Sequence, residues 1–332
     1  MYWVQVETKT RAGFSGMFTN TENLLLNICI FVFVADIVLF QFVDASIDYA
    51  GFALTSTVIL LLLVLGLIYR HVRTGGERLG ITLICAALLI LFSNVGAILN
   101  YLLLGIAGES IDPVLVRIDA ALGFHWPSFV AWMSKYPTFS ESLGWAYNST
   151  LPQIVIVMLI LGFTGRHESL YVMILCLTIS ALLTIGFWGA FPSYGTTAIY
   201  TMPEDIVQLI KPVVGNDYGE KLRALANNAQ PEISPRNVQG LIAMPSYHTI
   251  MALVTCYAVS GLRHWRYPFF VLNFFVALSI PLHGGHHLID LVAALVVSAA
   301  VILTVRKFSW SPVLQDALYE KSISSTNRSF TK

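Results

Sequence analysis

Charged residues are scarce in this chain of 332 residues: 11% are Asp, Glu, Lys or Arg, whereas 56% are hydrophobic. A soluble domain normally contains about a quarter charged residues. The 19 basic and 19 acidic residues also cancel, so there is no excess of positive charge to bind a polyanion. The composition therefore excludes an ordinary soluble domain and gives no indication of nucleic-acid binding.

Cysteine is also rare. The four cysteines lie inside apolar runs and show no Cys-x-x-Cys spacing. This pattern predicts reduced thiols in a packed core rather than disulfides or a zinc site. We expect no metal and no cofactor.

Long apolar runs take up most of the chain. Runs of roughly 20 apolar residues can cross a bilayer as helices. We therefore predict an all-α, polytopic transmembrane helical bundle of about eight spans. The expected spans are 23–43, 50–69, 79–104, 146–164, 169–190, 246–262, 267–283 and 286–305.

The basic residues indicate how these spans are oriented. Eight spans place both termini on one side, and the segments on that side contain 13 of the 19 Lys and Arg residues, against 6 on the other side. Because cytoplasmic loops are enriched in Lys and Arg, both termini are expected in the cytoplasm. Two long segments, 105–145 and 191–240, then lie outside. The first is typical of short interfacial helices that either anchor the chain or cover a site.

A first polar motif opens the span at 246–262. It reads Pro245-Ser246-Tyr247-His248, and Pro245 suits the first turn of a helix. Ser246 and His248 would then lie beside free backbone N–H groups at the positive end of the helix dipole, where an anion can bind.

A second motif, His283-Gly-Gly-His286-His287-Leu-Ile-Asp290, stands between two apolar runs. Ionisable groups at a membrane span indicate a functional site. His286 follows His248 by 38 residues, which two helices of about 17 residues and a tight turn would use up. The two imidazoles are therefore expected at the same outer face. Asp290, four residues after His286, is expected to share a helix face with it.

This set of residues fits phosphoryl transfer. A carboxylate can fix the tautomer and orientation of an imidazole and so prepare it as a nucleophile. A second imidazole can protonate a leaving group. The pattern predicts a phosphohistidine intermediate at the side away from the cytoplasm.

At these residues the chain resembles the type-2 phosphatidic acid phosphatase superfamily, which carries a Pro-Ser-x-His motif and a later Gly-x-His-x-x-x-Asp motif. The resemblance is strongest to the branch with the inositol phosphorylceramide synthases (the aureobasidin-target type) and their bacterial relatives, and it covers roughly 110–305. It implies His286 as nucleophile, Asp290 as its orienting base, His248 as acid and Ser246 as a phosphate ligand. Gly123-Phe-His-Trp126-Pro127 also resembles the bacterial relatives.

The chain departs from the phosphatases of that superfamily in its basic residues. Ile280 stands where they usually have Arg, and their upstream Lys-x6-Arg-Pro motif is missing. These losses resemble the phosphotransferase branch. Other groups must then bind the phosphate, and the candidates are Arg223, Lys221 and Arg236, with Arg223 first. His283 could contact a head group, whereas His287 should point about 100° away from His286.

Two other classes of function remain open. His283-x-x-His286-His287 also fits the histidine box of membrane di-iron oxidoreductases, although no second box accompanies it. A non-enzymatic transporter could instead use polar residues inside the spans, such as Asp36, Asn94 and Asn100. Interhelical hydrogen bonding is the simpler interpretation of these three.

We therefore expect an integral membrane lipid phosphotransferase or phosphatase. Residues 1–78 would form an N-terminal two-span extension, 79–305 a six-span catalytic bundle, and 306–332 a cytoplasmic tail. The expected partners are a phospholipid or other lipid-linked phosphate and the bilayer. The expected location is a bacterial inner membrane, with the active site facing the periplasm.

Overall fold

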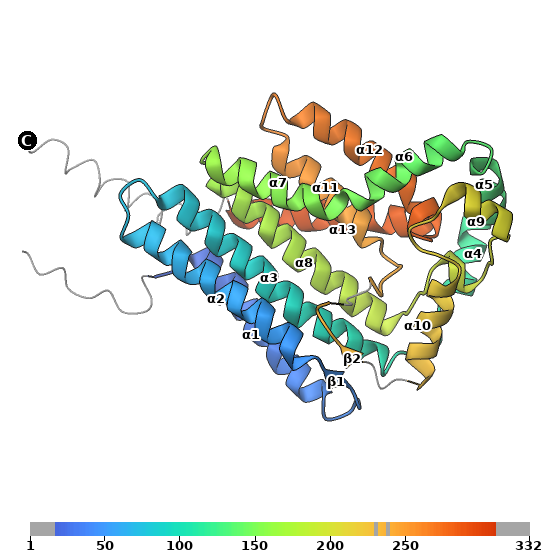
Figure 1. The fold of residues 1–332 in the computed structure, drawn as a ribbon, viewed down its shortest axis with the longest axis horizontal. Coiled ribbons are helices and arrows are strands. Elements are labelled where there is room, and N and C mark those ends of the chain that lie inside the picture. The colour runs from blue at the N-terminus through green and yellow to red at the C-terminus, as the bar shows by residue number, and fades with distance from the viewer. Residues whose placement is uncertain (1–16, 229–231, 237–239, 310–332) are drawn as a thin grey trace, which may run out of the picture.

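The computed structural model describes residues 17–228, 232–236 and 240–309, and the described chain is almost entirely helical. The predicted tail 306–332 therefore lies mostly outside the described residues. Three long helices, α1 (Asn20–Leu39), α2 (Tyr49–His71) and α3 (Glu77–Leu104), pack side by side at the N-terminal end of the fold (Figure 1).

The remaining long helices are α7 (Thr150–Phe163), α8 (His167–Ala190), α11 (Tyr247–Val259), α12 (Arg266–His283) and α13 (Leu288–Ser309). Helix α8 packs against α3, α7, α11 and α13, whereas α12 packs against α11. The core between them is apolar and includes Ile84, Met173, Ile250 and Ala294, all fully buried. Helix α8 is thus the central element of the bundle.

Within the residues that the structure describes, five helices are long and apolar enough to cross a membrane: α1, α2, α3, α8 and α13. The number rises to six if α6 (Pro137–Asn148) and α7, which bend by 48° at their junction, form one span. Large apolar side chains on α1, α2 and α13 point outward, among them Phe31, Leu54 and Leu303. Such surfaces suit lipid rather than water. The two shorter predicted spans, 246–262 and 267–283, correspond to α11 and α12, which do not meet the same test.

Short elements gather at one end of the bundle (Figure 1). The predicted outer segment 105–145 forms α4 (Asp112–Ala121), α5 (Trp126–Met133) and most of α6, and Trp126 Nε1 donates to the Pro281 carbonyl at 2.7 Å. The segment 191–240 contains the 3-10 turn η2 (Thr196–Ala198), α9 (Glu204–Ile210) and α10 (Asp217–Asn228). A two-residue parallel pairing of β1 (Ser46–Ile47) with β2 (Glu232–Ile233), which was not predicted, ties this segment to the N-terminal helices.

Candidate active site

The imidazole of His286 is held by the carboxylate of Asp290. Nδ1 lies 3.1 Å from Oδ2, and both side chains are buried. Because a carboxylate only accepts hydrogen bonds, Nδ1 carries the proton and Nε2 keeps a lone pair. The contact thus leaves the second ring nitrogen free to act as a nucleophile.

His286 precedes α13 and does not lie in its first turn, in contrast to the prediction that both side chains share one helix face. The helix begins at Leu288, and Gly285 has a φ of +61°, which favours glycine. The Gly285 carbonyl accepts from Thr196 N at 2.7 Å. The loop therefore brings His286 back over the first turn of α13, where Asp290 lies.

His248 lies in the first turn of α11. Ser246 is the N-cap, and its hydroxyl accepts from Thr249 N at 3.4 Å, so Pro245 lies just before the helix rather than in its first turn. The backbone N–H of Ser246 also donates to the Asp290 carbonyl at 3.2 Å. This contact joins the two motifs directly, in agreement with the expectation that the α11–α12 hairpin brings them to one face.

Tyr147 of α6 packs on His248. The two rings stack with centroids 4.3 Å apart and an interplanar angle of 21°, and the Tyr147 hydroxyl lies 3.4 Å from His248 Nδ1. Sequence reasoning missed Tyr147. The stacked phenol fixes the plane of the imidazole, which a proton donor needs for a directed transfer.

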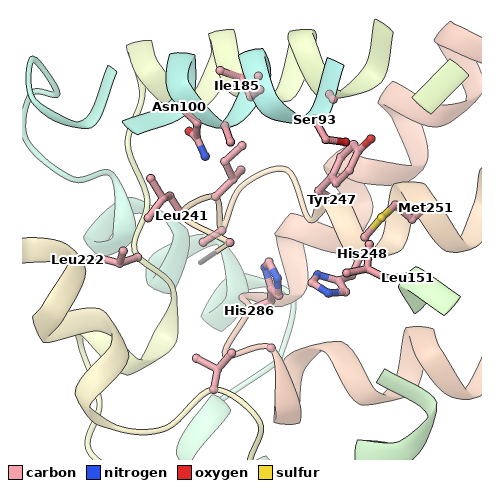
Figure 2. A pocket seen from close by; sticks show the side chains of 18 of the residues that line it. Ser93, Asn100, Leu151, Ile185, Leu222, Leu241, Tyr247, His248, Met251 and His286 are labelled. Carbon is pink, nitrogen blue, oxygen red and sulfur yellow. The ribbon is translucent and has the colours of Figure 1, made fainter. Parts of the chain in front are cut away.

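Both imidazoles line one pocket of about 620 Å³ (Figure 2). In this view the rings of His248 and His286 lie next to one another at the lower end, with apolar side chains above them. The lining is mainly apolar and comes from α3, α8, α10, α11 and the segment 240–243. No Lys or Arg of the described residues lines it.

His287 has a separate environment from its neighbour. Its Nε2 lies 3.4 Å from Asp112 Oδ1 and its Nδ1 lies 3.4 Å from Asp119 Oδ2, while its backbone N–H donates to Asp290 Oδ2 at 2.9 Å. It does not line the pocket, as its predicted direction implied. His287 thus lies between two carboxylates of α4 and beside the carboxylate that holds His286.

The electrostatics of this cluster favour a charged imidazole. His287 belongs to the loop between α12 and α13, outside the candidate spans. Burial disfavours its cation, but Asp112, Asp119 and Asp290 outweigh burial and raise the pKa of His287 to about 9. Burial likewise works against the Asp112 carboxylate, yet the hydrogen bonds from His287 and neighbouring groups hold its pKa below the ordinary value.

Two aspartates of helix α4 connect this helix to the site through hydrogen bonds. Asp119 accepts from the N–H groups of Leu288 and Ile289 at 2.9 and 3.0 Å and so caps α13. Asp112 accepts from Ser193, Tyr194 and Gly195. The segment thus covers the site as well as adjoining the membrane spans. The signal in the sequence was the spacing of seven between two Asp residues in an apolar segment, which places both on one helix face.

The other predicted phosphate ligands lie outside the pocket. His283 is buried, and its Nε2 lies 2.8 Å from the Ser140 carbonyl. Lys221 pairs with Asp217, and Arg236 lies 3.6 Å from Asp48. Ser246 is also absent from the lining. Phosphate binding by these four residues stays a prediction.

Arg223 of α10 contacts the η2 turn, whereas Lys221 and Arg236 lie beside carboxylates. It donates to the Ala198 carbonyl at 2.7 Å and follows Leu222, which lines the pocket. Burial and the Asp112 charge raise the pKa of the pocket residue Tyr194, and Arg223 acts in the opposite direction. Arg223 is therefore near enough to act electrostatically on a pocket residue.

The three clustered histidines do not converge as a histidine box would require. His283 contacts a backbone carbonyl, His286 contacts Asp290, and both ring nitrogens of His287 face α4 carboxylates. Among the described residues, no group of three or more His, Cys, Asp or Glu is arranged to hold a metal ion. The rings thus have three different environments.

The polar residues inside the spans also differ from one another. Asn94 donates to Thr55 Oγ1 of α2 at 2.9 Å, so interhelical hydrogen bonding is correct for this residue. It is wrong for Asp36 and Asn100: within the described chain, both Asp36 carboxylate oxygens and the Asn100 Oδ1 are buried without a hydrogen-bond partner. Of the three, only Asn100 lines the pocket.

Comparison with known proteins gives one match. A family model described as the PAP2 superfamily matches residues 113–304, which is more than half of the chain. The matched region contains both histidine motifs and begins after α3. No curated protein and no solved structure matches the chain.

Proposed function

The chain belongs to the PAP2 superfamily, whose members are generally phosphatases, and from this premise we propose that it is an integral membrane phosphatase or phosphotransferase for a lipid phosphate or phosphodiester. The observation that carries the proposal is the His286–Asp290 pair, because the His286 imidazole lines one mainly apolar pocket together with a second imidazole, His248. The proposed intermediate is a phosphohistidine on His286.

The geometry suggests a role for each residue in two steps. His286 Nε2 attacks phosphorus, the P–O bond to the leaving group breaks, and His248 gives its proton to the departing oxygen. Asp290 stabilises the positive charge that develops on the His286 ring. Water or an alcohol then attacks the phosphorus and passes its proton to His248, and the N–P bond breaks.

A substrate with a hydrocarbon portion fits the surroundings of the two imidazoles. Leu241 and Met251 line the pocket together with residues of the membrane helices α3 and α8. Ligand sites of this kind are mostly apolar, with a few polar groups that fix orientation. The reacting phosphate would lie at His286 while its apolar part occupies the rest of the pocket.

The charge on the phosphate needs positive partners, because no Lys or Arg of the described residues lines the pocket. Arg223 is the first candidate, because its charge acts on the pocket residue Tyr194. Lys221 and Arg236 already pair with Asp217 and Asp48, which makes them weaker candidates. Replacing Arg223 by Gln should raise KM more than it lowers kcat. The exposed Lys135, which does not line the pocket, serves as the control through Lys135→Gln.

The finer features of the proposal follow the sequence. The distribution of Lys and Arg favours eight spans with both termini in the cytoplasm, and the site would then face the periplasm of a bacterial inner membrane. The absence of the usual Arg at position 280 favours the inositol phosphorylceramide synthase-like branch, and thus transfer to an alcohol. Residues 79–305 would form the catalytic bundle and 1–78 an extension.

One experiment tests the function and identifies the acceptor. Purified protein is incubated with phospholipids labelled in the phosphate group, with and without candidate alcohols, and the label is followed into inorganic phosphate or a new phospholipid. Wild-type protein should release or transfer the label, and a folded His286→Asn variant should do neither. Equal turnover by wild type and this variant would contradict the proposal.

A further inference from the structure

One wall of the pocket comes from a helix outside the region matched by the family model. Six residues of α3 line the pocket, and the match begins thirteen residues after the last of them, at residue 113. Successive members of this set are alternately three residues and one residue apart in the sequence, which places all of them on one face of the helix. They are Leu89, Phe92, Ser93, Gly96, Ala97 and Asn100.

Most of this α3 face is apolar and opens toward α8. A Cβ atom on Gly96 would lie 3.6 Å from Phe92 Cζ and 3.8 Å from Ile185 Cδ1, which is ordinary van der Waals contact. A longer side chain at this position would extend into the pocket. The glycine therefore keeps space open between α3 and α8, far enough into the membrane bundle for a hydrocarbon chain.

Asn100 is the polar exception at the end of this face. Its residue is 9% exposed, and its Oδ1 has no hydrogen-bond partner among the described residues. Leaving a buried acceptor unsatisfied is energetically unfavourable. In Figure 2 its amide lies at the upper edge of the pocket, on the far side of the apolar side chains from the two imidazoles. A ligand that donates a hydrogen bond there would satisfy it.

We infer that the Leu89–Asn100 face of α3 binds the apolar chain of the phosphate substrate, and that the Asn100 amide accepts a hydrogen bond from a hydroxyl or amide group carried on that chain. The inference rests on the proposed function for the phosphate end at His286. It makes α3 a specificity-determining helix and not only a membrane anchor.

Crosslinking tests this inference without requiring turnover. The probe is a long-chain alkyl phosphonate with a diazirine in the chain, and crosslinked peptides are mapped by mass spectrometry. Wild-type protein should be labelled within residues 89–100. In a Gly96→Leu variant, labelling of these residues should be at least tenfold lower than in wild type. Gly186→Leu is the matched control, because a side chain on this exposed α8 glycine meets nothing within 4 Å, and it should be labelled like wild type.

A second variant covers the case in which Gly96→Leu fails to fold. Asn100→Leu removes an unsatisfied acceptor from an apolar site, so it should unfold at the same temperature as wild type or higher. The ratio of labelling by a probe with a chain hydroxyl to labelling by the plain alkyl probe should also be about tenfold lower than in wild type. An unchanged preference would overturn the role of Asn100.

The results separate this inference from the proposed function. Labelling of α3 without turnover of any phosphate would contradict the proposed function and support chain binding by the Leu89–Asn100 face of α3. Two results would contradict substrate binding by α3 without contradicting the proposed function. In both, wild-type protein turns over the phosphate, but either residues 89–100 are not labelled or Gly96→Leu does not reduce their labelling. Chain-length dependence gives a further readout, since Gly96→Leu should lower the ratio of long-chain to short-chain phosphate turnover at least tenfold.

Discussion

The charged state of His287 can be tested through the pH dependence of stability. Its folded pKa of about 9 lies above the ordinary histidine value of 6.5, so the proton binds more tightly in the folded protein. The resulting stabilisation is complete below about pH 6.5 and is lost as the pH rises through about 9. The difference between these two pKa values corresponds to a stabilisation of about 3 kcal/mol in total, of which about 2 kcal/mol is lost between pH 7 and 9.

The assay is thermal or denaturant unfolding in detergent at several pH values. The groups that face the ring are Asp112, Asp119 and Asp290, and a His287→Gln variant removes the proton that lies between them. This variant should therefore be less stable at pH 7 and should lack most of the decrease between pH 7 and 9. His264 is exposed, so His264→Gln is the control, and it should show the same decrease in stability between pH 7 and 9 as wild type. A wild-type stability that does not change over this range, or a variant that loses stability like wild type, would refute the reasoning.

Three further predictions concern the same account. His248→Gln should slow the cleavage of an alkyl phosphate much more than that of an activated aryl phosphate, because only the poor leaving group needs a proton; equal slowing in a kinetic comparison would argue against the acid role. Asp290→Asn should lower kcat by roughly 10²- to 10⁴-fold with the fold retained, and near wild-type kcat would remove the carboxylate from the mechanism. Arg70→Ala should destabilise the protein by about 3 kcal/mol because the buried Glu22 loses its partner at 2.6 Å, whereas the exposed Arg73→Ala should have little effect in the same unfolding assay.

The pairing of the two histidine motifs could be predicted because helix length fixes it. Two helices and a turn between His248 and His286 must return the chain to its starting face, and the Ser246–Asp290 backbone contact shows that they do. The all-helical class followed in the same way from the length of the apolar runs. The count of eight spans could not be tested in this manner, because α11 and α12 are helical but shorter or less apolar than the other spans.

The details around the site depend on contacts that no local pattern specifies. The loop conformation at Gly285, the stacking of Tyr147 on His248, and the carboxylates of α4 around His287 all join segments far apart in the chain. For Asn100, the sequence pattern suggests a contact that the described part of the structure does not contain. Its spacing is like that of a residue in an interhelical contact, but the pocket leaves it without a partner.

The most direct test of the central claim is to trap the phosphoenzyme. With an activated aryl phosphate, His248→Gln should still allow attack by His286 but should slow hydrolysis of the intermediate, which needs His248 as a base. An alkaline quench followed by mass spectrometry should then find a phosphoryl group on His286, and His248→Gln combined with His286→Asn should show none. Phosphate found on another residue, or turnover at the wild-type rate by His286→Asn alone, would contradict the account.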